Sequence, residues 1–415
     1  MKRILVLALY CALGLSSLIA QDFSRYVDPR IGSERLGRTF PGPCMPYGMA
    51  KPGPDAVSMP NAGWAPMPEP VKGFSQMHVS GTGGGQKYGN ILIQPFLDAG
   101  DIIQKRVDEK IALGYYACTF ENGIRTEITA SERCAFYRLD YGRKQKGKLM
   151  IDVATFLGID TIPDKRETQQ YVDSYVTCDG KYAVSGWSTV RGGWNNGGPY
   201  TVYFYLQSDV PLSNCDVPLS NSDAPLYNKV KESKTRLDVA FSKSVVNLKV
   251  GISHISIAQA RRNIPSCGFD TQLKNVRKTW NGKLGKIEIA ATEKQKRMFY
   301  TALYHTMLMP VDKSGENPHF SATPYYDDYY AIWDTYRTSM PLLTLIEEPQ
   351  QRDMVNSLLN IYKHDGYMPD ARSGNWNGRT QGGSNADIVI ADAFAKGMKG
   401  IDYQLALKAM IKDAE

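Results

Sequence analysis

The segment Trp333-Asp334-Thr335-Tyr336-Arg337 places a flat aromatic ring beside a carboxylate and a guanidinium. Asp334 and Arg337 are three positions apart, so in a helical turn they share one face. Such a set suits a sugar, whose hydroxyls need acceptors and donors while its C–H face stacks on a ring. The alternative is a buried Asp–Arg ion pair that joins two helices, with Trp333 in the core.

A second polar group interrupts an apolar stretch further along the chain. Asn385 and Asp387 come directly before the run Ile388-Val389-Ile390-Ala391-Asp392. Polar side chains in apolar surroundings need a ligand or each other. Asp387 is therefore a candidate ligand contact, and the alternative is that it caps the helix that follows.

A glycine-rich stretch at residues 73–85 contains His78 and ends in Gly83-Gly84-Gly85. It lacks the lysine and serine of a phosphate-binding P-loop, and its glycine spacing fits no dinucleotide fingerprint. We interpret it as backbone that runs close to another group, with His78 beside it. A histidine satisfied within its own loop is the alternative for His78. His305, in an apolar helical pattern, is better explained as a core residue.

Length and charge bound the class of protein. A chain of 415 residues is too long for one ordinary core, which predicts two domains. The net charge is +7, but the basic residues are scattered, as on solvated faces, and do not form a nucleic-acid patch.

The first twenty residues resemble an export signal. Lys2 and Arg3 precede an apolar run that is too short to span a membrane, and small residues lead to Ala20. We expect Sec-dependent export to the periplasm or the medium, without a lipid anchor, because Tyr10 before Cys11 is too large for a lipobox. No later stretch is apolar enough to cross a bilayer. The six remaining cysteines match no zinc pattern, and the choice between disulfides and buried thiols stays open.

Hydrophobic periodicity changes once along the chain. Between residues 91 and 260, short runs alternate with a period of two and are separated by turn signals. This pattern predicts an antiparallel β-sandwich over residues 21–270, with a bulge near His254. A linker helix at 271–280 and a strand at 285–289 should follow.

Helical spacing dominates after residue 293. We expect helices at 293–309, from Pro349 to Gly366 and at 386–399, the first of them apolar nearly all round. Paired helices after a β domain favour a helical-hairpin barrel over residues 293–415. Helical spacing continues to Glu415 without a capping residue, which suggests an incomplete chain.

In this order, the motifs resemble those of glycoside hydrolase family 92, the α-mannosidases. The matching pieces cover the chain from residue 26 to its end: YVDPRIG (26–32), FPG (40–42), PYGM (46–49), the 73–83 loop, FYTALYH (299–305), WDTYR (333–337), GYMP (366–369) and IVIADA (388–393). The resemblance implies a multi-domain β + α architecture, an N-terminal antiparallel β-sandwich followed by the first part of an (α/α)6 barrel.

The resemblance also implies exo-hydrolysis of α-mannosides, of the α-1,2 type, in mannose-containing glycans. The implied mechanism inverts the anomeric centre and depends on calcium, whose ligands we expect largely downstream. An inverting site needs an acid and a base roughly 6.5–9.5 Å apart. In this family both lie late in the barrel, so we expect them beyond Glu415 and assign neither role here.

The family pattern places substrate contacts on five residues of this chain. Asp334 would accept from mannose hydroxyls, and Arg337 would orient it or donate directly. His78 would lie on the pocket rim, Trp64 would be a stacking wall, and Asp387 would add a further contact. Asn385 stands where the family often has histidine. A non-catalytic carbohydrate-binding remnant is the main alternative function; a phosphorylase would need phosphate donors that are not evident.

Overall fold

The fold is described from a computed structural model of the chain. It describes residues 21–415 except 36, 82, 99, 101, 143–145, 159–166, 214–234, 330–331 and 379–382. The expected signal peptide, residues 1–20, lies outside these. Within the described part of the chain, no helix is long and apolar enough to cross a membrane.

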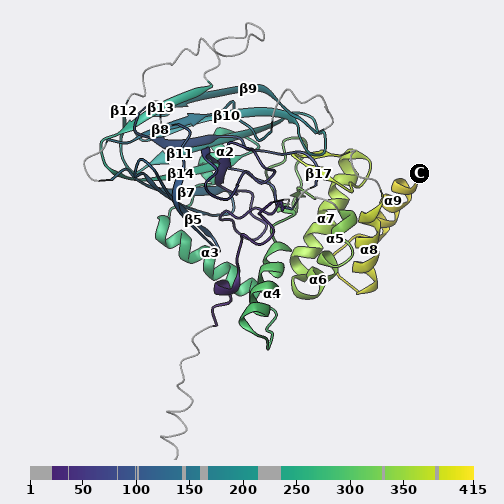
Figure 1. Cartoon of the computed structure of the whole chain (residues 1–415). Helices are drawn as coiled ribbons and strands as arrows, with labels where there is room; N and C mark the ends of the chain where they lie inside the picture. Colours follow the sequence, from purple (N-terminus) through teal and green to yellow (C-terminus); the bar gives the residue numbers. More distant parts are fainter. Residues whose placement is uncertain are drawn as a thin grey trace, which may run out of the picture.

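Two antiparallel sheets stack to form the first domain, as predicted (Figure 1). The six-stranded sheet has the order β1-β2-β3-β8-β13-β12. Its strands are β1 (Gly53–Ala56), β2 (Val71–Ser75), β3 (Leu92–Phe96), β8 (Lys148–Asp152), β13 (Arg236–Phe241) and β12 (Leu212–Ser213).

The eight-stranded sheet has the order β4-β5-β6-β7-β14-β11-β10-β9. Its strands are β4 (Arg106–Ala112), β5 (Tyr115–Phe120), β6 (Arg125–Ala130), β7 (Cys134–Asp140), β14 (Val245–Ser253), β11 (Tyr200–Ser208), β10 (Ala183–Gly192) and β9 (Gln169–Cys178). Alternate residues of both sheets, such as Ile128 and Tyr137 from one and Leu149 and Ile151 from the other, meet in one buried core.

The expected bulge near His254 is wrong, because β14 simply ends at Ser253. The alternation of buried and half-buried residues stops at Val250, and the last four residues of β14 are all buried. Helix α2 (Ile257–Arg262) packs against β14 and β11 and covers the second face there. The altered pattern therefore reflects burial on both faces.

The linker contains one long helix and no strand. Helix α3 (Phe269–Leu284) is longer than predicted and buries Val276, Trp280 and Leu284. The predicted strand at 285–289 is wrong, since these residues form a turn and extended coil. Ile287 and Ile289 still pack against the helical core, and Tyr300 donates to the Ile287 carbonyl at 3.1 Å. Their apolar alternation therefore reflects packing without sheet pairing.

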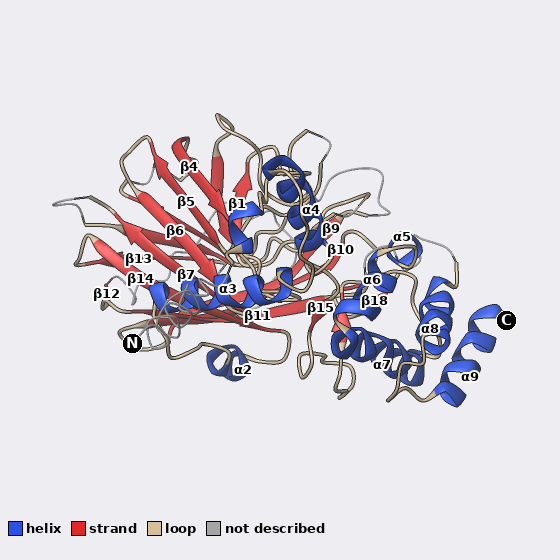
Figure 2. Ribbon diagram, turned by 90° about the horizontal axis from the view of Figure 1, so that it is seen from below, coloured by secondary structure: helices blue, strands red, loops and turns tan. Residues whose placement is uncertain are grey.

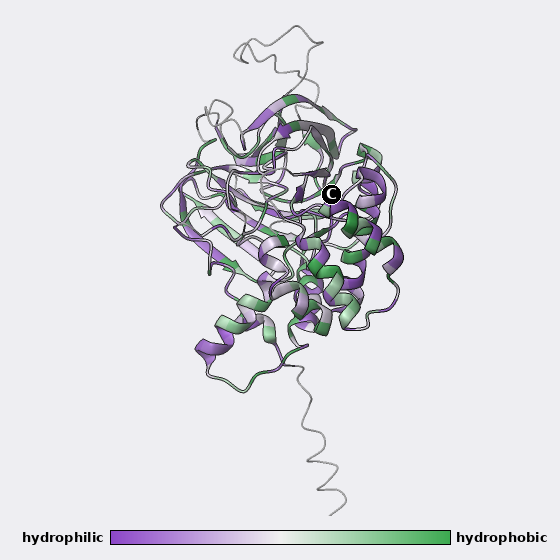
Figure 3. Ribbon diagram, turned by 90° about the vertical axis from the view of Figure 1, so that its right-hand side faces the viewer, coloured by the Kyte–Doolittle hydropathy of each residue, from purple (hydrophilic) through white to green (hydrophobic). Residues whose placement is uncertain are grey.

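Helices dominate the second domain, which extends to one side of the sandwich (Figure 2). They are α4 (Glu293–His305), α5 (Ile332–Thr335), α6 (Ser339–Ile346), α7 (Glu348–Asp365), α8 (Asn385–Ala395) and α9 (Tyr403–Ala414). Two short hairpins lie between them: β15 (Val311–Asp312) with β16 (Tyr326–Asp327), and β17 (Arg372–Ser373) with β18 (Trp376–Asn377). Hydrophobic and hydrophilic residues both occur along these helices (Figure 3).

Local signals explain where these helices begin and end. Thr292 and Gln295 form a capping box at the start of α4. Pro349 lies in the first turn of α7, and Gly366, with φ 87°, ends it in the left-handed conformation. The helix predicted at 293–309 ends at His305, and the prediction that it is apolar nearly all round is wrong, because its first turns are charged. Met298 is 60% exposed. Only one face of α4, including Tyr300 and Tyr304, is buried.

A buried ionic cluster joins the two domains. Lys313 contacts Asp327 at 2.7 Å and Asp328 at 3.1 Å, and it donates to the Tyr88 hydroxyl of the sandwich at 2.9 Å. Tyr88 in turn donates to Asp328 at 2.6 Å, and Arg372 contacts Asp327 at 3.3 Å. All five side chains are almost fully buried. The connections that carry the two hairpins are therefore fixed against the sandwich.

Candidate functional site

A small pocket lies between the glycine-rich loop of the sandwich and helices α4 to α6. It encloses about 140 Å³. Its lining comes from both domains: Ser80, Gly81, His305, Thr306, Met309, Pro310, Tyr329, Ile332, Asp334, Thr335, Ser339, Met340 and Leu343. We expected Asp334 and Arg337 to lie on the wall of one pocket with the glycine-rich loop, and this holds for Asp334 but not for Arg337. We call this pocket the Asp334 pocket.

Helix α5 presents Asp334 to the pocket and is anchored at its first residue, Ile332, which also lines the pocket. Ile332 is fully buried, and its backbone N–H donates to the Asp370 carbonyl at 3.1 Å. The Asp334 side chain is exposed, and neighbouring Trp333 is 46% exposed. The site therefore offers an accessible carboxylate next to an accessible aromatic ring.

Arg337 is not part of the pocket lining. Its guanidinium lies over the Tyr336 ring, 4.9 Å from the centroid, and the residue is exposed. A buried Asp334–Arg337 ion pair, the alternative considered for this motif, is wrong because neither residue is buried. The four-residue α5 ends at Thr335, so Asp334 and Arg337 do not share a continuous helical face.

The glycine-rich loop is positioned by its own domain. The Gly81 N–H donates to the Arg38 carbonyl at 2.8 Å, and Ser80 Oγ accepts from the Phe40 N–H at 3.1 Å. Gly81 has φ 78°, a conformation that side-chain-bearing residues rarely adopt. These contacts fix the Ser80–Gly81 backbone at the pocket wall. The interpretation that the glycines let the backbone run close to another group is wrong at Gly81, where a Cβ would meet no atom within 4 Å, and holds at Gly84 and Gly85, which lie close to Glu167.

His78 and Trp64 lie behind this wall, in the sandwich core. His78 is 3% exposed; its Nδ1 lies 2.7 Å from the Lys51 carbonyl oxygen and its Nε2 lies 2.7 Å from Asp55 Oδ1. Trp64 is also 3% exposed, and its indole N–H donates to Glu109 at 3.1 Å. Neither side chain lines the Asp334 pocket, because each is enclosed by partners of its own domain.

Asp387 lies in the first turn of α8, beside a second carboxylate. Ser384 is the N-cap residue, so the alternative that Asp387 caps this helix is wrong. Burial, reinforced by the charge of Asp413, raises the Asp387 pKa to about 6. One oxygen each of Asp387 and Asp413 is buried without a hydrogen-bond partner among the described residues. Asn385 donates to Asp370 at 2.7 Å, so it supports a neighbouring loop.

His305 is a pocket residue that the sequence analysis missed. It is half-buried at the end of α4 and lines the Asp334 pocket, and its Nε2 is buried without a partner in the described part of the chain. Burial lowers the His305 pKa to about 4, which keeps the ring neutral at physiological pH. A neutral imidazole can both donate and accept a hydrogen bond. The sequence did not signal this role, because the predicted helix continued to residue 309, whereas α4 ends at His305.

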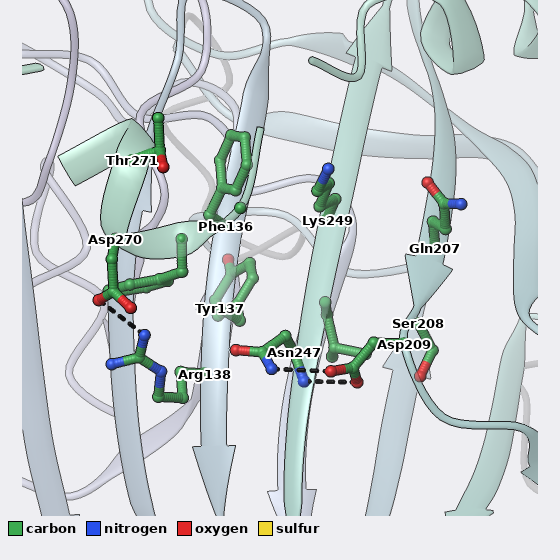
Figure 4. A pocket seen from close by; sticks show the side chains of 13 residues that line it. Phe136, Tyr137, Arg138, Gln207, Ser208, Asp209, Asn247, Lys249, Asp270 and Thr271 are labelled. Atoms are coloured by element: carbon green, nitrogen blue, oxygen red, sulfur yellow. Dashed lines mark hydrogen bonds and ion pairs between the residues drawn. The ribbon is translucent and has the colours of Figure 1, made fainter. Parts of the chain in front are cut away.

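Another hollow, of about 480 Å³, lies on the eight-stranded sheet beside the start of α3 (Figure 4). Its charged groups pair with each other or with the backbone. Arg138 contacts Asp270 at 2.8 Å, and Asn247 donates to Asp209 at 2.7 Å. These self-contained pairs leave few groups free for a ligand, and the hollow is better explained as a structural seam between sheet and helix.

The described residues contain no group of three or more His, Cys, Asp or Glu side chains arranged to hold a metal ion. Among the cysteines, Cys178 is disulfide-bonded, whereas Cys44, Cys118, Cys134 and Cys267 are free thiols.

Two family models match nearly the whole chain. The glycosyl hydrolase family 92 N-terminal domain matches residues 26–253, and the family 92 catalytic domain matches residues 257–415. An uncharacterized secreted glycosidase of Arthroderma benhamiae is 29% identical over 95% of this chain and 52% of its own length.

Solved structures show the same fold. A family GH92 α-mannosidase of Bacteroides thetaiotaomicron, in complex with mannoimidazole, has a TM-score of 0.81 at 24% identity. An inverting family GH92 mannosidase of the same species has a TM-score of 0.76 at 24% identity. In both comparisons the matched region covers 95% of this chain and 56% of the other chain. This chain therefore spans about half the length of these relatives. From its two matched domains, the chain belongs to glycosyl hydrolase family 92.

Proposed function

We propose that the protein is an exported exo-α-mannosidase and that the Asp334 pocket receives the terminal mannose of a glycan. The observation that carries this proposal is the meeting of an accessible carboxylate, Asp334, with the glycine-rich loop in one small pocket. Family membership and the fold of the mannosidase neighbours support it.

The pocket chemistry suits one sugar ring. Its volume of about 140 Å³ is below the roughly 300–1,000 Å³ of pockets for drug-sized ligands. The Asp334 carboxylate accepts hydrogen bonds from two adjacent hydroxyls, and neutral His305 donates or accepts a third. The exposed ring of Trp333 offers a flat surface beside the entrance.

Inverting hydrolysis needs a second carboxylate that this pocket does not provide. Of the described residues that line it, Asp334 is the only carboxylate, whereas an inverting site requires an acid and a base. We therefore propose that Asp334 binds substrate and that acid and base lie outside these 415 residues. Asp387 is not among the described residues that line the pocket, and its contact with substrate stays a prediction. Inversion, calcium dependence and α-1,2 specificity are expectations from the family resemblance.

Export through residues 1–20, to the periplasm or the medium, remains part of the proposal. The similarity to a secreted glycosidase and the disulfide at Cys178 support it. Disulfides persist in oxidising compartments and are rare in the cytosol.

Titration of the chain with methyl α-mannoside by NMR or calorimetry tests the binding role. Replacing Asp334 by asparagine removes a charged acceptor, and losing such hydrogen bonds costs about 1.5–3 kcal/mol, roughly a tenfold to hundredfold rise in Kd. Asp392→Asn is the matched control, since Asp392 lies on α8, where it pairs with Lys396. Equal binding by D334N and the wild type would refute the assignment.

A non-catalytic carbohydrate-binding protein is the second candidate, favoured because the described residues that line the pocket include one carboxylate. An assay for mannose release from an α-mannoside, with calcium and with a chelator, separates the two. We expect the 415-residue chain to bind but not to hydrolyse. Release of mannose that depends on calcium would show that the acid and base lie within these residues.

A further inference from the structure

A second pocket lies where the β17–β18 hairpin meets the β10–β11 loop of the sandwich. It encloses about 480 Å³, and we call it the hairpin pocket. Aromatic and polar side chains alternate around it: Asn196, His319, Asp365, Tyr367, Trp376 and Asn377. It shares none of its described lining residues with the Asp334 pocket.

The aromatic wall is held in place by the other domain. The Trp376 indole N–H donates to the Pro199 carbonyl at 3.0 Å, and the Trp376 carbonyl accepts from Asn195 at 3.0 Å. The loop backbone passes so close beneath the ring that a Cβ on Gly198 would lie 2.7 Å from the indole. His319 packs edge-on to Trp376, with centroids 4.5 Å apart. The half-buried indole is therefore a fixed surface before any ligand arrives.

Arg372, buried behind the hairpin, orients two amides of the pocket. It donates to Asn377 Oδ1 and, at 3.1 Å, to the Tyr325 hydroxyl, which donates to Asn375 Oδ1 at 3.0 Å. A guanidinium can only donate, so the oxygens of both amides are assigned. Their nitrogens are buried without an acceptor in the described part of the chain. A buried unpaired donor costs about 1–3 kcal/mol, so the wall is not satisfied by the protein's own groups.

The charges of the pocket indicate a neutral, hydroxyl-rich ligand. Asp365 is the only charged residue among the described residues of the lining, and it pairs with Arg372 at 2.7 Å through one oxygen. None of the described lining residues offers a cation to a phosphate or carboxylate. Exposed Tyr367 adds a second ring beside the carboxylate. A saccharide needs aromatic rings on which its C–H faces can stack, and carboxylate and amide groups that form hydrogen bonds with its hydroxyls.

We propose that the hairpin pocket is a saccharide-binding subsite, which holds another sugar unit of the glycan whose terminal mannose enters the Asp334 pocket. The choice of mannose as the sugar rests on the proposed function. The Asp370 carbonyl accepts from Ile332 of α5, beside the Asp334 pocket, and Trp376 lines the hairpin pocket. The backbone path from Asp370 to Trp376 is at most about 20 Å long. The two pockets are therefore near enough for an oligosaccharide of several sugar units to extend from one to the other.

Binding of a linear α-linked mannotriose, followed by calorimetry and by the indole N–H signal of Trp376, tests the subsite. The indole signal is assigned from a Trp376→Phe variant. Tyr367→Ala and His319→Ala remove exposed rings, so neither should impair folding. Tyr182→Ala, an exposed tyrosine of the sandwich outside the pocket, is the matched control.

We expect mannotriose to shift the Trp376 signal, and each pocket variant to weaken mannotriose binding about tenfold while methyl α-mannoside binding stays unchanged. With Asp334→Asn, mannotriose should still shift the Trp376 signal. If mannotriose shifts the Trp376 signal but the wild type does not bind methyl α-mannoside, the proposed function is refuted and the subsite is supported. An unmoved Trp376 signal, or equal losses with Tyr182→Ala, would overturn the subsite.

Discussion

Replacing Asp387 by asparagine should stabilise the protein at neutral pH. The Asp387 carboxyl is partly buried, faces Asp413 and has one oxygen without a partner among the described residues. Both the burial and the neighbouring charge disfavour the ionised form, and they raise its pKa from 3.8 to about 6. Asparagine has nearly the same shape, carries no charge and brings a donor toward Asp413.

The expected gain follows from this pKa difference. A pKa of about 6 in the folded state, against 3.8, corresponds to about 3 kcal/mol. Because the side chain is only partly buried, solvent screening reduces the expected effect to about 1 kcal/mol.

The folded state holds the Asp387 proton more tightly, so wild-type stability falls as pH rises from about 4 to about 6. The advantage of D387N is therefore near zero at pH 4 and complete above pH 6.

Urea denaturation at a series of pH values between 4 and 7.5 measures this directly. The quantity of interest is the difference in unfolding free energy between D387N and the wild type at each pH, because contributions common to both cancel. Asp98→Asn, at an exposed loop position, is the control and should show no pH-dependent gain. D413N should reproduce part of the gain, and the double variant should gain less than the sum. A gain that does not vary with pH would refute the electrostatic explanation.

Three further outcomes are expected. Replacing Lys313 by methionine leaves Asp328 buried without its ammonium partner, so urea titration should show a loss of about 3–5 kcal/mol; an unchanged midpoint would contradict the role of the cluster. Millimolar calcium should leave the melting temperature of this chain unchanged relative to a chelator, because its described residues form no metal cluster; a rise of several degrees would reveal a site. Gly63→Ala should destabilise, since a Cβ there would lie 2.5 Å from His78 Nε2 in a φ 78° conformation; a neutral result by thermal melting would show that the loop relaxes.

The sequence predicted the sandwich and the helical domain because periodicity depends on local residues. Strand β13 alternates buried and half-buried residues along its length, and α7 has both its terminal signals, Pro349 and Gly366, in the sequence. The strand expected at 285–289 failed because the same alternation also arises when Ile287 and Ile289 pack against helices. A pattern of burial does not identify the partner that buries it.

Site residues were harder to predict because a residue type does not show whether its partners lie in the same domain. Asp334 was placed correctly in a pocket with the glycine-rich loop, since a charged residue amid apolar helices needs such a setting. His78 has the composition of a rim residue, but Asp55 and Lys51 enclose it from distant positions in the chain. His305 resembled a core residue, and only the end of α4 at this position opens it to the pocket.

The buried ionic cluster connects the geometry of the two pockets. Tyr329, in the wall of the Asp334 pocket, directly follows Asp328 and forms a bridge with Arg372. Arg372 in turn orients the amides of the hairpin pocket. Lys313 contacts Asp328 and donates to the Tyr88 hydroxyl of the sandwich. A buried network whose members are paired resists rearrangement, because breaking one pair exposes an uncompensated charge to the interior. The cluster therefore supports residues in the walls of both pockets.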